Sequence, residues 1–187
     1  MVIIRIFCFV ILKGYIRLFY SVSVKNFYYL KNSKTPIIIA SNHPSLIDTL
    51  IFKIVFPRVF YVNGAKSNYF SNPIKRLTMK LGRVQQISSF ENFVAETKDI
   101  LFCRGKDLLM YPQMSRSSNL THFVDWCAKT SLMLEVNIIP VNIRYKSKGK
   151  LRSKVQICIG EPILTNSSNI SVIKLNNLLY QKIKELD

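Results

Sequence analysis

A histidine and an aspartate lie close together in the stretch SNHPSLID, residues 41–48. The chain has only two histidines, and Asp48 follows one of them, His43, by five residues. An aspartate one helical turn beyond a histidine can bind one imidazole nitrogen, fix the tautomer and stabilise the imidazolium. The other ring nitrogen can then accept a proton as a general base. The same spacing also suits a plain helix start, with the aspartate complementing the helix dipole.

The second histidine, His122, has no comparable partner at the end of a strand, and we expect it on the surface or at the entry to a helix. A second polar segment, QMSRS at residues 113–117, follows the apolar run DLLMYP. Within it, Arg116 stands between two serines, and a planar guanidinium beside hydroxyls suits a phosphate or a carboxylate. A solvated loop arginine is the simpler alternative. The stretch VNGAK adds a weaker signal, because Gly64 permits a tight turn and Lys66 carries a positive charge.

The elements that must position these residues alternate between strand and helix. The apolar run at 36–41 predicts a buried strand, and Pro44 suits the first turn of a helix over 45–56. This places His43 at the carboxyl end of a strand, where open α/β sheets form their binding crevices. We expect further strands at 58–66 (with a turn at Asn63 and Gly64), 106–112, 137–146 and 154–163, and further helices at 72–82, 91–105, 121–136 and 171–186. The pattern predicts an α/β fold with a single-domain sheet flanked by helices, either parallel or mixed.

Residues 1–32 are rich in aromatic and basic side chains. Basic residues interrupt the apolar run, so it never reaches the about 20 apolar residues of a spanning helix, and it lacks the layout of a signal peptide. We expect an amphipathic, membrane-associating helical segment whose lysine and arginine stems reach the lipid headgroups. A core-packing helix is an equal alternative, and a spanning anchor a minor one. The predicted organisation is therefore 1–32 as this segment and 33–187 as the folded domain.

The chain is strongly basic, with 27 Lys and Arg against 10 Asp and Glu and a formal charge of +17. Such a charge favours a polyanionic neighbour, either nucleic acid or an anionic membrane surface. The basic residues are dispersed among apolar ones and match no nucleic-acid-binding signature, so no nucleic acid is expected. The four cysteines are far apart without a CxxC pair, so we expect no metal site and free thiols in a reducing cytosol.

Four ordered segments resemble blocks of the glycerolipid (lysophospholipid) acyltransferase family, which includes 1-acylglycerol-3-phosphate acyltransferases. SNHPSLID resembles the NHxxxxD block, and LLMYPQMSRSS stands where that family has FPEGTRS. NIIPVNI is similar to the family's apolar proline block, and VQICIGEPI to its late strand ending in Gly-Glu-Pro-Ile. Together they cover about residues 36–164. The resemblance identifies 33–187 as an acyltransferase domain.

The resemblance implies direct acyl transfer from a thioester. His43 would remove the proton from an acceptor hydroxyl, and Asp48 would orient His43 and balance its charge. The donor would be acyl-CoA or acyl carrier protein, as a co-substrate without a cofactor, and the acceptor a lysophospholipid or related lipid. The expected location is the cytoplasmic face of the membrane, with peripheral or monotopic attachment. The expected substrate-binding residues are Asn42, Ser45, Gly64, Lys66, Gln113, Ser115 and Arg116.

The chain also departs from the family pattern. Gln113 replaces an acidic residue, and Met114 replaces a glycine, so a backbone conformation that requires glycine is expected to be lost there. An arginine usual after the LGR segment is absent from VQQISS, and Arg83 is displaced from that position. These changes leave the acceptor open among lysophosphatidate, a sugar, an aminolipid and other hydroxyls. They also leave an alternative: a catalytically weak or inactive basic relative that binds lipid or nucleic acid.

Overall fold

The computed structural model describes residues 2–33, 36–56, 58, 60–65, 73, 76, 79–80, 82–86, 88–117, 119–146, 152–165 and 170–186. Side chains are described from residue 10 onward, except at 64, 65 and 86. The predicted helix at 72–82 therefore lies largely outside the described residues.

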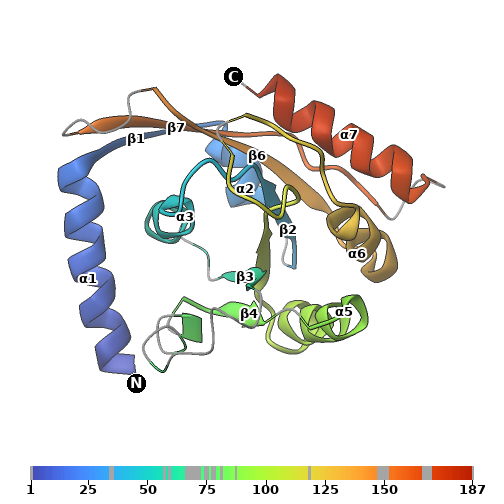
Figure 1. The fold of residues 1–187 in the computed structure, drawn as a ribbon, viewed down its shortest axis with the longest axis horizontal. Helices are drawn as coiled ribbons and strands as arrows, with labels where there is room; N and C mark the ends of the chain where they lie inside the picture. Colours follow the sequence, from blue (N-terminus) through green and yellow to red (C-terminus); the bar gives the residue numbers. More distant parts are fainter. Residues whose placement is uncertain are drawn as a thin grey trace.

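The described strands form one seven-stranded sheet with the order β1-β7-β6-β2-β5-β3-β4 (Figure 1). Strand β7 runs antiparallel to β6, β1 runs parallel to β7, and the other neighbouring pairs are parallel. The sheet is thus mixed. The strands are β1 (Tyr20–Lys25), β2 (Ile38–Ser41), β3 (Phe60–Ala65), β4 (Val84–Gln86), β5 (Asp107–Met110), β6 (Ile138–Tyr145) and β7 (Ser153–Ile159).

Helices cover both faces of the sheet. Figure 1 shows α1 and α3 on one side and α5, α6 and α7 on the other. The helices are α1 (Val2–Phe19), α2 (Phe27–Asn32), α3 (Asp48–Val55), α5 (Phe90–Lys98), its π-helical continuation η2 (Asp99–Cys103), α6 (Trp126–Leu134) and α7 (Val172–Glu185). Gly105, with a φ of 57°, follows η2 and ends this helical stretch as expected.

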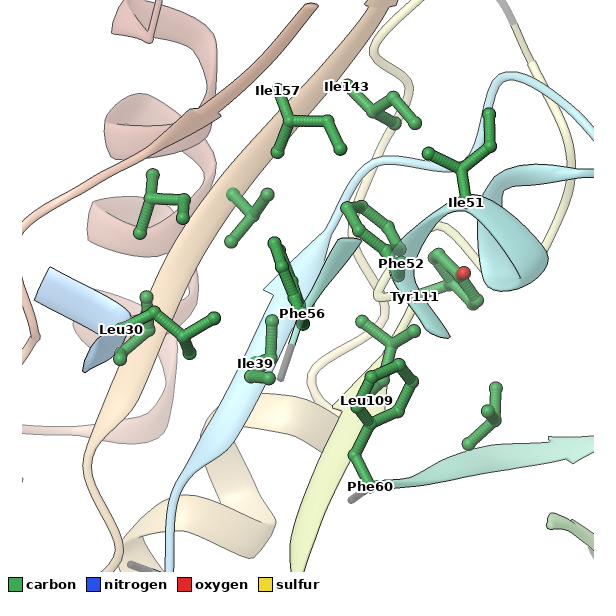
Figure 2. Close-up of a cluster of buried hydrophobic side chains, with 14 of the residues drawn as sticks. Leu30, Ile39, Ile51, Phe52, Phe56, Phe60, Leu109, Tyr111, Ile143 and Ile157 are labelled. Carbon is green, nitrogen blue, oxygen red and sulfur yellow. The ribbon is translucent and has the colours of Figure 1, made fainter. Parts of the chain in front are cut away.

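Two hydrophobic clusters lie on the two faces of the sheet. Along β2 and the residue before it, Ile37 and Ile39 pack in the cluster on the α3 side, whereas Ile38 and Ala40 pack in the cluster beneath α5, α6 and α7. Figure 2 shows the α3 side, where Phe52 and Phe56 lie close to Ile39 and Leu109. Because both faces of the central strands are buried, these strands consist of continuous apolar residues rather than alternating ones.

The amino-terminal segment differs from the prediction. Residues 1–32 are not helical throughout, because Tyr20–Lys25 form β1, an edge strand that pairs in register with β7. The sequence YSVSVK alternates between half-buried and exposed side chains, as an edge strand does. Residues 20–25 therefore belong to the same sheet as the rest of the fold. The division of the chain after residue 32 stays a prediction.

Two further boundaries were predicted incorrectly. Asn63 and Gly64 lie inside β3 instead of forming a turn, and the pairing of β3 with β4 shifts register between Val62 and Ala65. Helix α6 begins at Trp126 rather than near residue 121, because the preceding segment is bonded to the residues that follow β5: the Val124 N–H donates to the Pro112 carbonyl at 2.9 Å. Among the described residues, no helix combines the length and hydropathy needed to cross a membrane.

A buried ion pair holds the amino ends of two central strands. The Arg58 guanidinium donates to Asp107 at 2.6 Å and to the carbonyls of Leu30 and Ser33, each at 2.9 Å. Asp107 also accepts from the Ile37 N–H at 3.2 Å. This network ties the end of α2 to the start of β2 and β5. It lies at the opposite end of these strands from His43 and thus positions the sheet without contacting the candidate site.

Candidate active site

Three neighbouring parallel strands end at one edge of the sheet and supply the polar residues there. Strand β2 leads into the turn that carries His43, β5 leads into Tyr111 and the loop up to Ser117, and β6 ends at Tyr145. The order β6-β2-β5 places the histidine turn between the other two strand ends. Open α/β sheets bind ligands at such carboxyl ends.

His43 and Asp48 contact each other directly. The distance from His43 Nδ1 to Asp48 Oδ2 is 2.9 Å; Asp48 is fully buried, and the His43 side chain is 18% exposed. Asp48 Oδ2 also accepts from the Ser45 N–H at 2.8 Å, and Asp48 Oδ1 from the Tyr145 hydroxyl at 2.5 Å. A carboxylate with these donors requires Nδ1 to carry the proton, because an unprotonated Nδ1 would meet it lone pair to lone pair. Nε2 is then the basic nitrogen.

Two tyrosines complete the surroundings of this pair. Burial raises the pKa of Tyr145, and the buried charge of Asp48 raises it further, so the phenol stays neutral and donates to Asp48. The pKa of Tyr111 is also well above its usual value, mainly through burial. Its ring stacks on the His43 imidazole, with centroids 4.0 Å apart and an interplanar angle of 17°. Its hydroxyl is 2.9 Å from the Thr49 hydroxyl. The Tyr111 side chain is therefore held both by this hydrogen bond and by the stacking on His43.

Asn42 holds the histidine turn against β6. Its Nδ2 donates to the Ile143 carbonyl at 3.0 Å, and its Oδ1 accepts from the Ile143 N–H at 2.8 Å. Both groups of the amide are therefore engaged with backbone. The Ser45 N–H is likewise bound to Asp48. That these two residues also contact a substrate stays a prediction.

Gln113 holds the other side of the histidine turn. Its Oε1 accepts from the His43 N–H at 3.2 Å, and its Nε2 donates to the Asn119 carbonyl at 3.1 Å and to Thr121 Oγ1 at 3.0 Å. The Ser117 N–H donates to the His43 carbonyl at 3.0 Å, so both backbone groups of His43 are bonded to this segment. A carboxylate could replace Oε1 but not the Nε2 donors, and this explains why an amide suits the position.

The next three residues of the loop, 114–116, differ in backbone conformation and in hydrogen bonding. Met114 has a φ of 55°, so the left-handed conformation that favours glycine is retained, and the expectation that it is lost was wrong. The Ser115 hydroxyl donates to the Gln113 carbonyl at 3.3 Å. Arg116 is exposed and lies in the loop between Gln113 and Ser117, the two residues that bind the His43 backbone.

The structure brings most of the predicted site residues together, with two exceptions. Gly64 lies in β3, the strand beside β5, and Lys66 lies outside the described residues. Sequence reasoning missed Tyr111, Tyr145 and Asn63, whose Oδ1 accepts from the Tyr111 N–H at 3.1 Å. All three stand at or near strand ends, and that position was the available signal. Among the described residues, no group of three or more His, Cys, Asp or Glu side chains could hold a metal ion.

A family model described as Acyltransferase matches residues 21–144, a range that includes His43, Asp48, Gln113 and Arg116 and stops just before Tyr145. No curated protein matches the chain. Among solved structures, the chain is similar to the crystal structure of the 1-acyl-sn-glycerophosphate (LPA) acyltransferase PlsC from Thermotoga maritima. The TM-score is 0.72 at 17% identity, over 96% of this chain and 78% of that one, so the two share a fold.

Proposed function

This chain belongs to the acyltransferase family, as its motifs indicated, and we propose that it transfers a fatty acyl group from an acyl thioester to a hydroxyl of a lysophospholipid or related lipid. The observation that carries the proposal is the 2.9 Å contact between His43 Nδ1 and the buried Asp48, at the carboxyl end of β2. The donor is acyl-CoA or acyl carrier protein, and no cofactor takes part.

In the proposed reaction, His43 Nε2 takes the proton of the acceptor hydroxyl while the oxygen attacks the thioester carbonyl carbon. Asp48 holds the Nδ1 proton and stabilises the imidazolium that forms. The tetrahedral intermediate then collapses, the carbon–sulfur bond breaks, and the leaving thiolate takes the proton back from Nε2. The products are an ester and a free thiol, and His43 returns to its starting state without an acyl-enzyme.

The surroundings of His43 support this role because they restrict its movement. Tyr111 covers one face of the ring, Asn42 ties the turn to β6, and Gln113 and Ser117 bind the backbone on either side. A base held in one orientation loses little freedom when the acceptor binds, which lowers the barrier of a reaction between bound partners.

For substrate binding, we assign the anionic group of the acceptor or donor to Arg116, with Ser115 beside it, and we include Gly64 of β3 and Lys66, which follows β3 in the sequence. Arg116 is exposed and has no hydrogen bond or ion pair with the described part of the chain, so its guanidinium is available to a ligand. Leu46 and Met114 near the site are 73% and 44% exposed, and they offer apolar contacts to a lipid chain.

We further propose peripheral or monotopic attachment to the cytoplasmic face of a membrane, through α1. Ile11, Tyr15 and Leu18 are 55%, 45% and 60% exposed and share one side of this helix. Ile16 points elsewhere and is buried in the core. Together with the charge of +17, this apolar stripe fits an anionic lipid surface.

The test is acyl transfer by the full-length protein, measured with radiolabelled acyl-CoA and acyl carrier protein against a panel of lysolipids. His43→Ala and Asp48→Asn should each reduce kcat, His43→Ala by ~10²–10⁴-fold, as loss of a general base does. His122→Ala is the matched control, because the second histidine is exposed and Asp48 binds His43 instead. Equal turnover in His43→Ala and His122→Ala would remove His43 from the mechanism. No transfer by the wild type to any acceptor would favour a binding protein without catalysis.

A further inference from the structure

A pocket of about 410 Å³ lies beside the histidine turn. It is formed where the turn after β2, residues 119 and 120, the end of β6 and the last turn of α7 meet. Its lining includes Asn42, Pro44, Asn142, Arg144, Tyr145 and Lys184. Pockets of this size commonly hold small molecules or part of a larger one.

The polar wall of this pocket is held in place by hydrogen bonds within the chain. Asn142, which is buried, donates from Nδ2 to the carbonyls of Ile183 at 3.1 Å and Leu186 at 2.7 Å, and so fixes the end of α7 to β6. Asn42 is held by both of its hydrogen bonds to Ile143. A site whose walls are already positioned costs less ordering entropy when a ligand binds.

The charges in the pocket have one sign. Arg144 and Lys184 are the charged residues of the lining, and no carboxylate belongs to it. They come from different elements, β6 and α7, so the fold rather than local sequence brings them together. Two cations around a polar, half-enclosed space favour an anion, and Arg and Lys bind phosphate through several charge-assisted hydrogen bonds.

The pocket also adjoins the proposed reaction centre. Asn42 and Pro44 are the neighbours of His43 in the chain, and Tyr145 donates its hydroxyl proton to Asp48. An occupant of the pocket would therefore contact the residues that hold the base. Arg116 cannot be the cation used here, because it is not part of this lining.

We propose that this pocket binds a phosphate group of one of the two substrates through Arg144 and Lys184. The phosphate comes either from the headgroup of the acceptor or from the acyl donor, whose CoA or phosphopantetheine part carries phosphates. The identity of the ligand rests on the proposed acyl transfer, but the anion site itself does not. The site is thus a second cationic contact, separate from Arg116.

A binding experiment tests the site independently of turnover. The full-length protein is titrated calorimetrically with CoA and with glycerol 3-phosphate, a soluble form of a phosphate headgroup. Lys184→Gln and Arg144→Gln should each weaken binding of at least one probe by about five- to tenfold, the size expected for a lost charge-assisted contact. Lys182→Gln removes the same charge from the same helix outside the pocket and should leave both affinities unchanged. Equal affinities in Lys184→Gln, Arg144→Gln and Lys182→Gln for both probes would overturn the proposal.

Kinetics then identify the source of the phosphate. If the donor supplies it, Lys184→Gln should raise KM for acyl-CoA but not for acyl-pantetheine, which has no phosphate. If the acceptor supplies it, the variant should raise KM for a lysophospholipid but not for a monoacylglycerol. KM values unchanged for all four substrates would overturn the proposal, even with an active enzyme. A third outcome separates the two proposals. If the wild type transfers no acyl group, but Lys184→Gln binds the probes more weakly than the wild type does, the anion site is supported and the proposed function is contradicted.

Discussion

At the scale of single residues, Gln113 shows most directly why this site differs from the family pattern. Its amide accepts from the His43 N–H and donates to Asn119 and Thr121, so one side chain joins the histidine turn to the following loop. A glutamate at this position would keep the acceptor but place a negative oxygen against the Asn119 carbonyl. The glutamine that replaces the family's acidic residue thus suits the hydrogen-bond partners that surround this position in this chain.

Gln113→Glu should therefore lower the free energy of unfolding by about 1–3 kcal/mol, the usual cost of leaving buried polar groups unpaired. Urea unfolding would measure it, with Gln181→Glu, the same change on the exposed side of α7, as the control. We also expect lower kcat in Gln113→Glu with every acceptor, because the backbone of His43 loses a firm partner. Unchanged stability would contradict this structural role, and improved use of lysophosphatidate alone would indicate that this position selects the acceptor instead.

Met114 illustrates a different residue-scale effect, because it occupies a conformation that glycine favours. At a φ of 55° its Cβ is crowded by the backbone, which costs about 1–2 kcal/mol for a residue other than glycine. We expect Met114→Gly to be more stable than Met114→Ala by up to about 1 kcal/mol, since both remove the side chain but only glycine relieves the crowding. Urea unfolding of both variants would measure the difference, and a less stable Met114→Gly would contradict the argument.

At the scale of elements, the sequence was most informative where local pattern and burial agree. The apolar runs of β2, β5 and β6 and the periodic pattern of α7 predicted these elements, and with them the position of His43 at a strand end. Strand β1 was missed because its partner β7 lies more than a hundred residues away, and no local pattern encodes such a pairing. Tyr145 was missed for the same reason, since its contact with Asp48 joins β6 to α3.

The same scale applies to α1, whose apolar stripe is exposed rather than covered by the sheet. The double variant Ile11→Ser, Leu18→Ser should bind vesicles containing anionic lipid at least about tenfold more weakly than the wild type, because full burial of an apolar side chain contributes about 1.5–3 kcal/mol and both side chains are more than half exposed. Ile173→Ser is the control, an isoleucine 74% exposed on α7, and it should bind like the wild type. Cosedimentation with vesicles would measure this. Equal binding of the double variant and the control would exclude α1 as the membrane contact. If salt did not weaken vesicle binding by the wild type, the positive charge would be excluded as a contribution to that binding.

At the scale of the whole molecule, protons on buried groups link folding to pH. Cys127 is fully buried against the sheet, and burial raises the pKa of its thiol from 9.0 to about 12. Between these values the unfolded chain has released the proton and the folded chain still holds it. Unfolding in this range is therefore accompanied by proton release, so the folded state loses stability as pH rises above about 9, by about 1.4 kcal/mol per pH unit for one such group. The pKa values of Tyr111 and Tyr145 are also raised, so these residues further reduce the stability of the folded state as pH rises above about 10.

Cys127→Ala should accordingly lose less stability than the wild type between about pH 8 and about pH 10, although truncation makes it less stable at the lower pH. Cys103→Ala is the matched control, because Cys103 is exposed and should keep the wild-type dependence. Urea midpoints at both pH values would give the two slopes. Since the tyrosines remain in every variant, all three proteins should still weaken above about pH 10. If Cys127→Ala and Cys103→Ala lost stability equally over the lower interval, the buried thiol would not be the group that links folding to pH there.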